Sequence, residues 1–228
     1  YPETKITPTQ KKALSRAASR LEAGIPLPYI LGHWEFYGLD FKLAPTVLIP
    51  RPETETLIEQ ALDWLRAHPN RRRAADIGTG SGCIAVTLAK LIPDLHVTAT
   101  DISAKALQIA RSNAQNHGVI DRISLVKSDL FPEENEKPDF DLICANLPYI
   151  PTAKLHSLEV YGREPTLALD GGPDGLTLIR SLSRQAPQRL TRGGLLLLEI
   201  DSSQGTRALT LAQEAFPRAN AHLLPDLA

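Results

Sequence analysis

Alternating strand-like and helix-like segments constrain the fold of this chain more than any other feature. The segments expected to form strands are 74–77, 96–100, 123–126, 141–145 and 195–200. The segments expected to form helices lie near 82–91, 104–117, 176–189 and 204–216. Short, nearly continuously apolar strands separated by helices are typical of a mostly parallel sheet with helices on both faces. The sequence therefore predicts an α/β fold whose ligands lie beyond the carboxyl ends of the strands.

The first part of the chain follows other patterns. A helix is expected to begin at Thr7-Pro8, with apolar residues at helical spacing, and to end at Gly24. Apolar residues then alternate over 34–49 around Gly38, which predicts a β-hairpin. An amphipathic helix is expected over 57–65, so the hairpin links an N-terminal helical segment to the α/β part.

The composition fits one well-packed domain, because the chain has 228 residues, 43% of them hydrophobic. The sequence has neither an apolar run of about 18 residues nor a leader pattern, so we expect a cytoplasmic protein without membrane contact. Cys83 and Cys144 fall in an expected helix start and a buried strand, and both are expected to be free thiols. Met is absent and the chain begins at Tyr1, so we expect a piece of a longer protein.

The charge balance argues against a protein that grips nucleic acid. Lys and Arg number 25 against 26 Asp and Glu, a formal charge of -1, without the global basic excess that phosphate binding requires. The basic run Arg71-Arg72-Arg73 is expected to be a solvated loop, with a binding patch as the alternative. The acidic run 133–137 is also expected to be a solvated loop.

A glycine-rich loop, Asp76-Ile77-Gly78-Thr79-Gly80-Ser81-Gly82, follows the first strand of the expected sheet and opens a helix. Three glycines at alternate positions allow a tight turn and bring a ligand against main-chain N–H groups. A dinucleotide fingerprint requires glycine at position 83, where Cys83 stands, and a phosphate-cradling loop requires Lys followed by Ser or Thr. Neither pattern occurs, so a phosphate ligand is disfavoured.

Two acids follow the next two strands. Asp101, roughly twenty residues beyond the loop, can accept hydrogen bonds from ribose hydroxyls, although it could instead cap the following helix. Asp129 can accept from an adenine amine, with Leu130 packed on the purine. A loop without a phosphate grip, combined with an acid for the ribose, favours S-adenosylmethionine over a dinucleotide.

The run Asn146-Leu147-Pro148-Tyr149 ends the fourth strand and can hold a planar NH2 group. The Asn146 side-chain oxygen can accept one N–H and the Leu147 carbonyl the other. Pro148 favours an extended Leu147, which turns that carbonyl outward, and Tyr149 offers a ring face. A loop without function is the alternative for this run taken alone.

In the glycine loop, the two acids and the run 146–149, the chain resembles the class I S-adenosylmethionine-dependent methyltransferases. More narrowly, it resembles the HemK-type protein-(glutamine-N5) methyltransferases, which modify the Gly-Gly-Gln glutamine of bacterial class I peptide chain release factors. The segments that carry the resemblance are 28–32, 35–38, 48–55, 76–82, 101, 146–149, 164–165, 168–169 and 171–172. The Arg-Pro-Glu-Thr-Glu segment at 51–55 separates this family from a related branch that methylates a ribosomal-protein glutamine.

The resemblance implies a Rossmann-like domain, with S-adenosylmethionine as cofactor and S-adenosylhomocysteine as product. The residues that it assigns to the cofactor are Gly78, Thr79, Gly80, Ser81, Gly82, Asp101, Asp129, Leu130 and Asn146. The residues that it assigns to the glutamine and to methyl transfer are Asn146, Leu147, Pro148 and Tyr149, with Phe36 and Arg51 closing the pocket. The expected partner is a release factor, bound by a monomer without nucleic acid, membrane or metal.

The same resemblance implies three parts. Residues 1–32 would be the end of a helical substrate-binding domain, 33–50 a hairpin linker and 51–228 the methyltransferase domain. Two departures stand out: Leu147 replaces the first of two prolines, and the chain stops at Ala228, where the family continues into a final strand. We expect activity to persist despite Leu147, because the proposed acceptor is a main-chain carbonyl.

Three rival functions remain open at this point. A nucleic-acid methyltransferase acting on adenine N6 or guanine N2 uses the same kind of four-residue motif, because those amines are also planar and conjugated. The near-neutral charge argues against it. A cofactor-binding module without catalysis is the second rival, and a dehydrogenase is the third.

Overall fold

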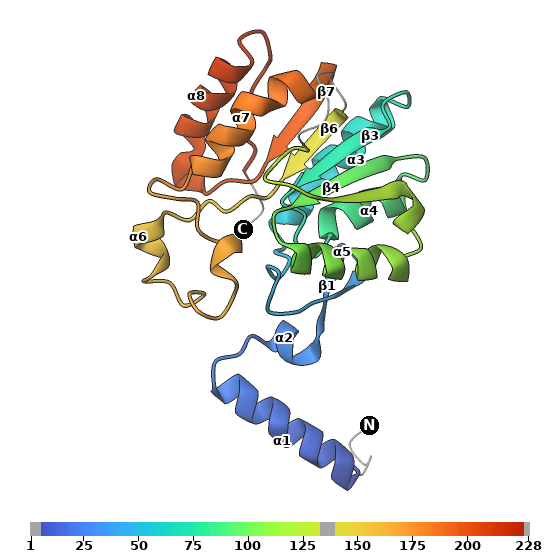
Figure 1. The fold of residues 1–228 in the computed structure, drawn as a ribbon, viewed down its shortest axis with the longest axis vertical. Helices are drawn as coiled ribbons and strands as arrows, with labels where there is room; N and C mark the ends of the chain where they lie inside the picture. The colour runs from blue at the N-terminus through green and yellow to red at the C-terminus, as the bar shows by residue number, and fades with distance from the viewer. Residues whose placement is uncertain (1–5, 133–139, 226–228) are drawn as a thin grey trace.

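A five-stranded parallel sheet forms the centre of the computed structural model, which describes residues 6–132 and 140–225 (Figure 1). Its strands are β3 Arg73–Ile77, β4 His96–Asp101, β5 Ile123–Lys127, β6 Phe140–Ala145 and β7 Leu190–Leu198. Their order across the sheet is β5-β4-β3-β6-β7. The chain moves outward from β3 to β5 and then crosses back to β6, so the order reverses between β3 and β6. Ligands bind at such a reversal, beyond the carboxyl ends of the strands.

Helices cover both faces of the sheet, as predicted (Figure 1). They are α3 Thr54–Ala67, α4 Cys83–Leu91, α5 Ala104–Asn116, α7 Thr177–Arg189 and α8 Gly205–Ala215. Side chains alternate along β6, so Leu142 and Cys144 pack with α3 and α4, whereas Ile143 and Ala145 pack with α7. The short helices are η1 Ile120–Arg122, α6 Thr152–Leu155, η2 Thr166–Ala168 and η3 Ser202–Gln204.

The last strand is longer at its start than predicted. Phe140 pairs with Leu190, but Leu142 already pairs with Leu195, so residues 191–194 form an irregularity in β7. This segment contains Gly193 with φ +72, a conformation typical of a turn, which explains why the sequence pattern starts the strand at 195.

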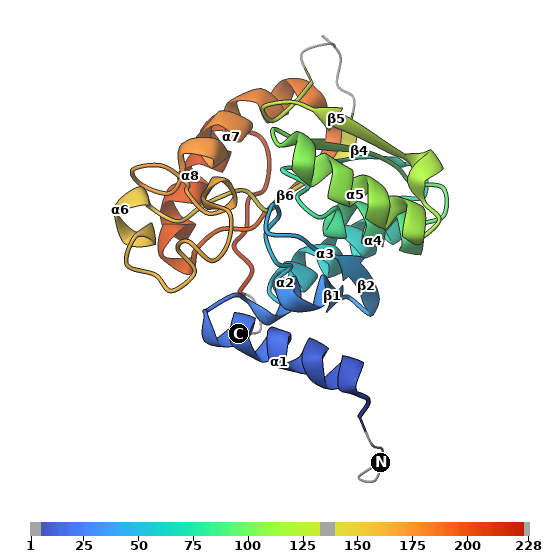
Figure 2. The ribbon, with the colours of Figure 1, turned by 60° about the horizontal axis from the view of Figure 1, so that its bottom comes forward.

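Two helices precede the hairpin, and the first of them extends away from the sheet (Figure 2). Helix α1, Pro8–Glu22, begins as predicted, because the Thr7 and Gln10 side chains each bond the other's backbone N–H in a capping box. Helix α2, Leu27–Leu31, was not predicted; it ends at Gly32. None of the residues of α1 is buried.

The hairpin consists of β1 His33–Phe36 and β2 Leu39–Lys42, so the prediction of a hairpin up to residue 49 was too long. Tyr37 and Gly38 both have positive φ, the conformation of a tight type I′ turn. Beyond β2 the chain is irregular, because Pro45 lacks a backbone N–H for strand pairing. The Asn113 side chain of α5 bonds both backbone polar groups of Lys42 and so fastens the hairpin to the main domain.

The basic run at 71–73 is not the solvated loop that the sequence predicted. Arg71 bonds Asp141 at 3.1 Å and the Arg192 carbonyl at 2.8 Å, and Arg72 pairs with Asp94 at 2.7 Å. These contacts tie the start of β3 to its neighbours. The acidic run 133–137 lies outside the described residues.

Both cysteines are free thiols, as predicted; Cys144 is buried and Cys83 is partly buried. Within residues 6–132 and 140–225, no helix combines the length and the apolar character needed to cross a bilayer.

Candidate active site

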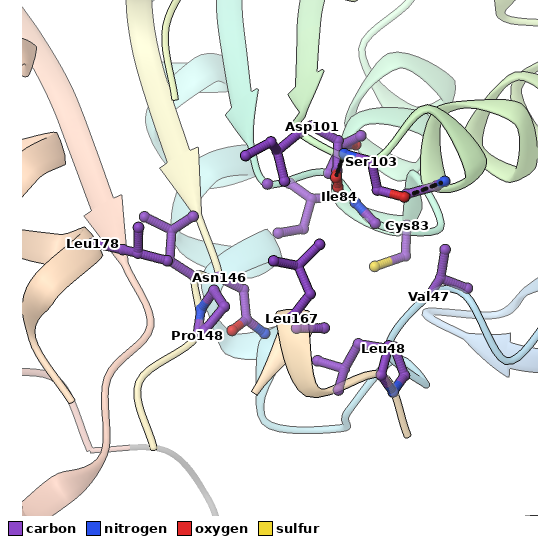
Figure 3. Close-up of a pocket in the computed structure, with 18 of the residues that line it drawn as sticks. Val47, Leu48, Cys83, Ile84, Asp101, Ser103, Asn146, Pro148, Leu167 and Leu178 are labelled. Atoms are coloured by element: carbon purple, nitrogen blue, oxygen red, sulfur yellow. Dashed lines mark hydrogen bonds between the residues drawn. The ribbon is translucent and has the colours of Figure 1, made fainter. Parts of the chain in front are cut away.

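A cavity lies at the carboxyl ends of β3, β4, β5 and β6 (Figure 3). In the close-up, Asp101 and Ser103 lie on one side of the cavity and Asn146 and Pro148 on the other, with Leu167 between them. We call these the glycine-loop side (residues 78–80 and 101) and the Asn146 side (residues 146–148). The site residues predicted from sequence that line the cavity are Arg51, Gly78, Thr79, Gly80, Asp101, Asp129, Leu130, Asn146, Leu147 and Pro148.

On the glycine-loop side, the main-chain N–H groups bond the protein itself. The N–H groups of Gly78 and Thr79 both donate to the Thr100 carbonyl, at 2.9 and 2.8 Å, and that of Gly80 donates to Asp101 at 2.9 Å. The expectation that these N–H groups face a ligand is therefore wrong. Because the donors are already used, this loop cannot cradle a phosphate in the way that nucleotide loops do.

A buried carboxylate fastens the same loop. Asp76 Oδ2 accepts the Thr79 hydroxyl at 2.5 Å and the Ala85 N–H at 3.1 Å. Burial raises the pKa of Asp76 to about 6, an effect that these two hydrogen bonds partly oppose and nearby Asp101 reinforces. Ser81 and Gly82 do not line the cavity. Any contribution of these two residues to cofactor binding stays a prediction.

Asp101 and Asp129 both reach the cavity from adjacent strands. One oxygen of Asp101 accepts the Gly80 N–H and the other accepts the Ser103 N–H at 2.8 Å. The carboxylate therefore also orders the entry to α5, yet each of its oxygens retains a lone pair. Burial raises the pKa of Asp101. Leu130 adopts a positive φ of 65, which is strained for a branched side chain and is held here at the cavity wall.

On the Asn146 side, side chains hold one another. Asn146 Nδ2 donates to the Thr54 hydroxyl at 2.9 Å, and Thr54 donates to Glu199 Oε2 at 2.6 Å. The Tyr149 hydroxyl donates to the other oxygen of Glu199 at 3.3 Å. Glu199 follows β7, where its N–H bonds the Ala145 carbonyl at 3.0 Å. One carboxylate thus braces both polar side chains of the predicted motif.

The remaining residues of the motif are placed by packing and by the backbone. Leu147 is buried, and its Cδ2 lies so close to Gly78 that a Cβ there would be 2.8 Å away. The Tyr149 carbonyl accepts the Gln204 side chain at 2.7 Å. Tyr149 itself does not line the cavity, so its contact with the substrate stays a prediction.

Two predicted closing residues have different surroundings. Arg51 lines the cavity and makes a short ion pair with the buried Glu164, which also accepts the Ile49 N–H at 3.0 Å. Phe36 is only 2% exposed, packs edge-on against Phe41, and lines a separate hollow. The predicted substrate contact of Phe36 therefore has no counterpart in the lining of the main cavity.

Sequence reasoning assigned no role to Thr54, Glu199 or Gln204. The three lie in separate parts of the chain and share no motif. Glu199 offered a usable signal, because it is an acid near the end of a predicted strand, where ligands of parallel sheets bind.

Residues 54–160 match the family described as Methyltransferase small domain. The chain is similar to the ribosomal protein L11 methylase of Lactobacillus delbrueckii subsp. bulgaricus, with a TM-score of 0.53, 26% identity, and coverage of 72% of this chain and 69% of that one. A SAM-dependent methyltransferase from Agrobacterium tumefaciens shares the fold, with a TM-score of 0.59 at 16% identity over 81% of this chain and 58% of that one. The fold and the site together define a class I methyltransferase.

Two curated relatives narrow the class. The release factor glutamine methyltransferase of Moorella thermoacetica is 45% identical over 99% of this chain and 80% of the relative. That of Neisseria gonorrhoeae is 43% identical over 96% of this chain and 78% of the relative. The chain belongs to the release factor glutamine methyltransferase family.

Proposed function

We propose that this protein transfers a methyl group from S-adenosylmethionine to the side-chain amide nitrogen of the glutamine in the Gly-Gly-Gln motif of class I peptide chain release factors. Membership of the family supports the reaction. The observation that carries the residue assignment is the fixed Asn146 carboxamide, whose NH2 group is bonded to Thr54 at 2.9 Å. Its oxygen is thereby left as the acceptor for a substrate N–H.

The cavity suits S-adenosylmethionine better than a phosphate-bearing cofactor. Within the described residues, Arg51 is the only cationic side chain that lines it, and Glu164 already neutralises that charge. Asp101 has spare lone pairs for ribose hydroxyls, and Asp129 with Leu130 would flank the adenine. When bound, the cofactor would supply an electrophilic methyl group.

Alignment and hydrogen bonding would supply most of the rate enhancement. The Asn146 oxygen and the Leu147 carbonyl accept the two N–H groups of the glutamine amide and so stabilise positive charge developing on its nitrogen. The nitrogen becomes acidic only after its new N–C bond forms, so the proton then leaves to solvent and the reaction needs no general base beforehand. Pro148 and Tyr149 would support the plane of the amide.

The N-terminal segment would contribute to docking of the release factor. Residues 1–32 would belong to a substrate-binding part, 33–50 would link it, and 51–228 would carry out methyl transfer. The lack of buried residues in α1 supports this division, because the helix leaves most of its surface free for a partner. The enzyme would act as a cytoplasmic monomer without direct contact to nucleic acid.

The test is a methyl-transfer assay with labelled S-adenosylmethionine and two substrates, a release factor and its variant with Ala in place of the Gly-Gly-Gln glutamine. Label should enter the first protein and not the second. Equal labelling of the release factor and its variant would mean that the methyl group is transferred to a residue other than this glutamine. Label entering RNA or DNA instead would favour a nucleic-acid methyltransferase, and cofactor binding without any transfer would favour an inactive module.

A further inference from the structure

A chain of three side chains ends at the Asn146 carboxamide. Asn146 donates to the Thr54 hydroxyl at 2.9 Å, and Thr54 donates to Glu199 at 2.6 Å. Thr54 is 1% exposed and begins α3, whereas Glu199 follows the edge strand β7. Because the three residues come from separate elements, the orientation of Asn146 depends on how those elements meet.

The direction of the hydrogen bonds follows from the number of protons available. A threonine hydroxyl has one hydrogen, and an ionised carboxylate can only accept. The Thr54 hydroxyl therefore donates its hydrogen to Glu199, and a lone pair of the hydroxyl oxygen faces Asn146. Only the NH2 end of the carboxamide can bond that lone pair, since the opposite orientation would set two acceptors against each other.

The oxygen end of Asn146 remains free. Among the described residues, none donates a hydrogen bond to Asn146 Oδ1, and this atom is not among the buried polar atoms that lack a partner. An oxygen that is both unpaired and accessible is ready to accept a hydrogen bond from a ligand in the cavity that Asn146 lines.

We propose that Thr54 and Glu199 are positioning residues that keep the Asn146 oxygen turned toward the substrate amide. This inference rests on the proposed function, because it assigns the oxygen to a glutamine N–H. Neither residue touches the reacting atoms; both act through Asn146.

A dependence on pH follows from the same geometry. Burial raises the pKa of Glu199, while hydrogen bonding from Thr54, Tyr149 and, more weakly, the Asn146 side chain lowers it. The other titratable groups that interact with Glu199 are Glu53, whose charge raises that pKa, and Cys83, whose own pKa is raised to about 12 so that it stays neutral. A protonated Glu199 can donate to Thr54, which then turns its own hydrogen toward Asn146. The carboxamide would reverse and present NH2 to the substrate, so kcat should fall as pH falls through the pKa of Glu199.

The kinetic test compares three variants. Thr54→Val keeps the shape but removes the hydroxyl, and should lower kcat about 10–100-fold through misorientation. KM for the release factor and Kd for S-adenosylmethionine should change less than about twofold. Thr54→Ser restores a hydroxyl and should recover most of the loss. The matched control is Thr56→Val in the same helical turn, whose hydroxyl has no hydrogen bond among the described residues and which should behave as wild type.

Two further measurements separate positioning from a merely structural role. The acid limb of the kcat–pH profile should be present in the wild type and absent in Glu199→Gln, which cannot gain a proton. In the nitrogen-15 NMR spectrum of the cofactor-free protein, the Asn146 NH2 hydrogens should exchange slowly with solvent in the wild type and quickly in Thr54→Val.

The outcomes distinguish this inference from the proposed function. Wild-type kcat in Thr54→Val, or equal exchange of the Asn146 NH2 hydrogens in both proteins, would overturn the positioning role even if the enzyme methylates release factors. Failure of the wild type to methylate a release factor would overturn the proposed function, and the exchange experiment would still decide whether Thr54 orients Asn146.

Discussion

The two sides of the cavity are held in place by interactions of different range. On the glycine-loop side, the side-chain hydrogen bonds of Asp76 and Asp101 span 2, 3, 9 and 21 residues. On the Asn146 side, the bonds that join Asn146 to Thr54, Thr54 to Glu199 and Tyr149 to Glu199 span 92, 145 and 50 residues. The first side forms within one strand–loop–helix unit and the neighbouring strand. The second side forms only when the sheet is assembled out to its edge strand β7.

Each side is also braced by a carboxylate, buried in the case of Asp76 and partly buried in the case of Glu199, but the two do different things. Asp76 binds a main-chain N–H and a loop hydroxyl, and so maintains the path of the backbone. Glu199 binds two hydroxyl groups, and so maintains the orientation of side chains. Changes on the glycine-loop side should therefore affect stability and cofactor affinity, and changes on the Asn146 side should affect turnover.

The largest effect on stability should come from the titration of Asp76. The pKa is 3.8 in an unfolded chain and about 6 in the folded protein. Between these values only the folded protein keeps the proton, so unfolding releases it and the free energy of unfolding falls as pH rises. The loss from pH 3 to 7, relative to Asp76→Asn, should reach about 3 kcal/mol. Urea denaturation at several pH values measures it, and parallel curves for the two proteins would contradict the assignment.

A smaller effect is expected on cofactor affinity. Asp101→Ala removes an acceptor for the ribose and leaves the Gly80 and Ser103 N–H groups without a partner. Kd for S-adenosylmethionine should rise about 30-fold, while kcat at saturating cofactor stays within about threefold. Isothermal titration and steady-state kinetics measure the two quantities. A loss in kcat that exceeds the loss in affinity would contradict the assignment of cofactor affinity to the glycine-loop side and turnover to the Asn146 side.

The smallest effect tests the contact between the two sides. Gly78 and Gly118 both have positive φ, +74 and +69, but only at Gly78 would a Cβ meet another side chain, Leu147 at 2.8 Å. Gly118→Ala therefore measures backbone strain alone, and Gly78→Ala should cost about 1–2 kcal/mol more in stability. Combining Gly78→Ala with Leu147→Ala should remove the coupling, as a double-mutant cycle of thermal denaturation would show. Equal costs for the two glycine variants would mean that the sides pack independently.

The sequence separation of these interactions explains how much of the fold and of the site could be predicted from the sequence. The five strands, the flanking helices and the glycine loop follow from local periodicity and turn chemistry, and the structure confirms them. The predicted end of the hairpin was wrong, because apolar alternation continues past Lys42 while strand pairing does not. The ends of the strands brought most predicted residues to one cavity, but Phe36 packs elsewhere. The Thr54–Glu199 bond joins residues that no local pattern connects.

The central claim is that the Asn146 oxygen contributes far more to methyl transfer than to cofactor binding. The most direct measurement is the single-turnover rate of Asn146→Ala with saturating S-adenosylmethionine and release factor, together with its Kd for the cofactor. We expect the rate to fall about 10²–10³-fold, as when one preorganised transition-state hydrogen bond is removed, with a much smaller change in Kd. A rate near that of the wild type, or losses of equal size in rate and cofactor affinity, would contradict the account.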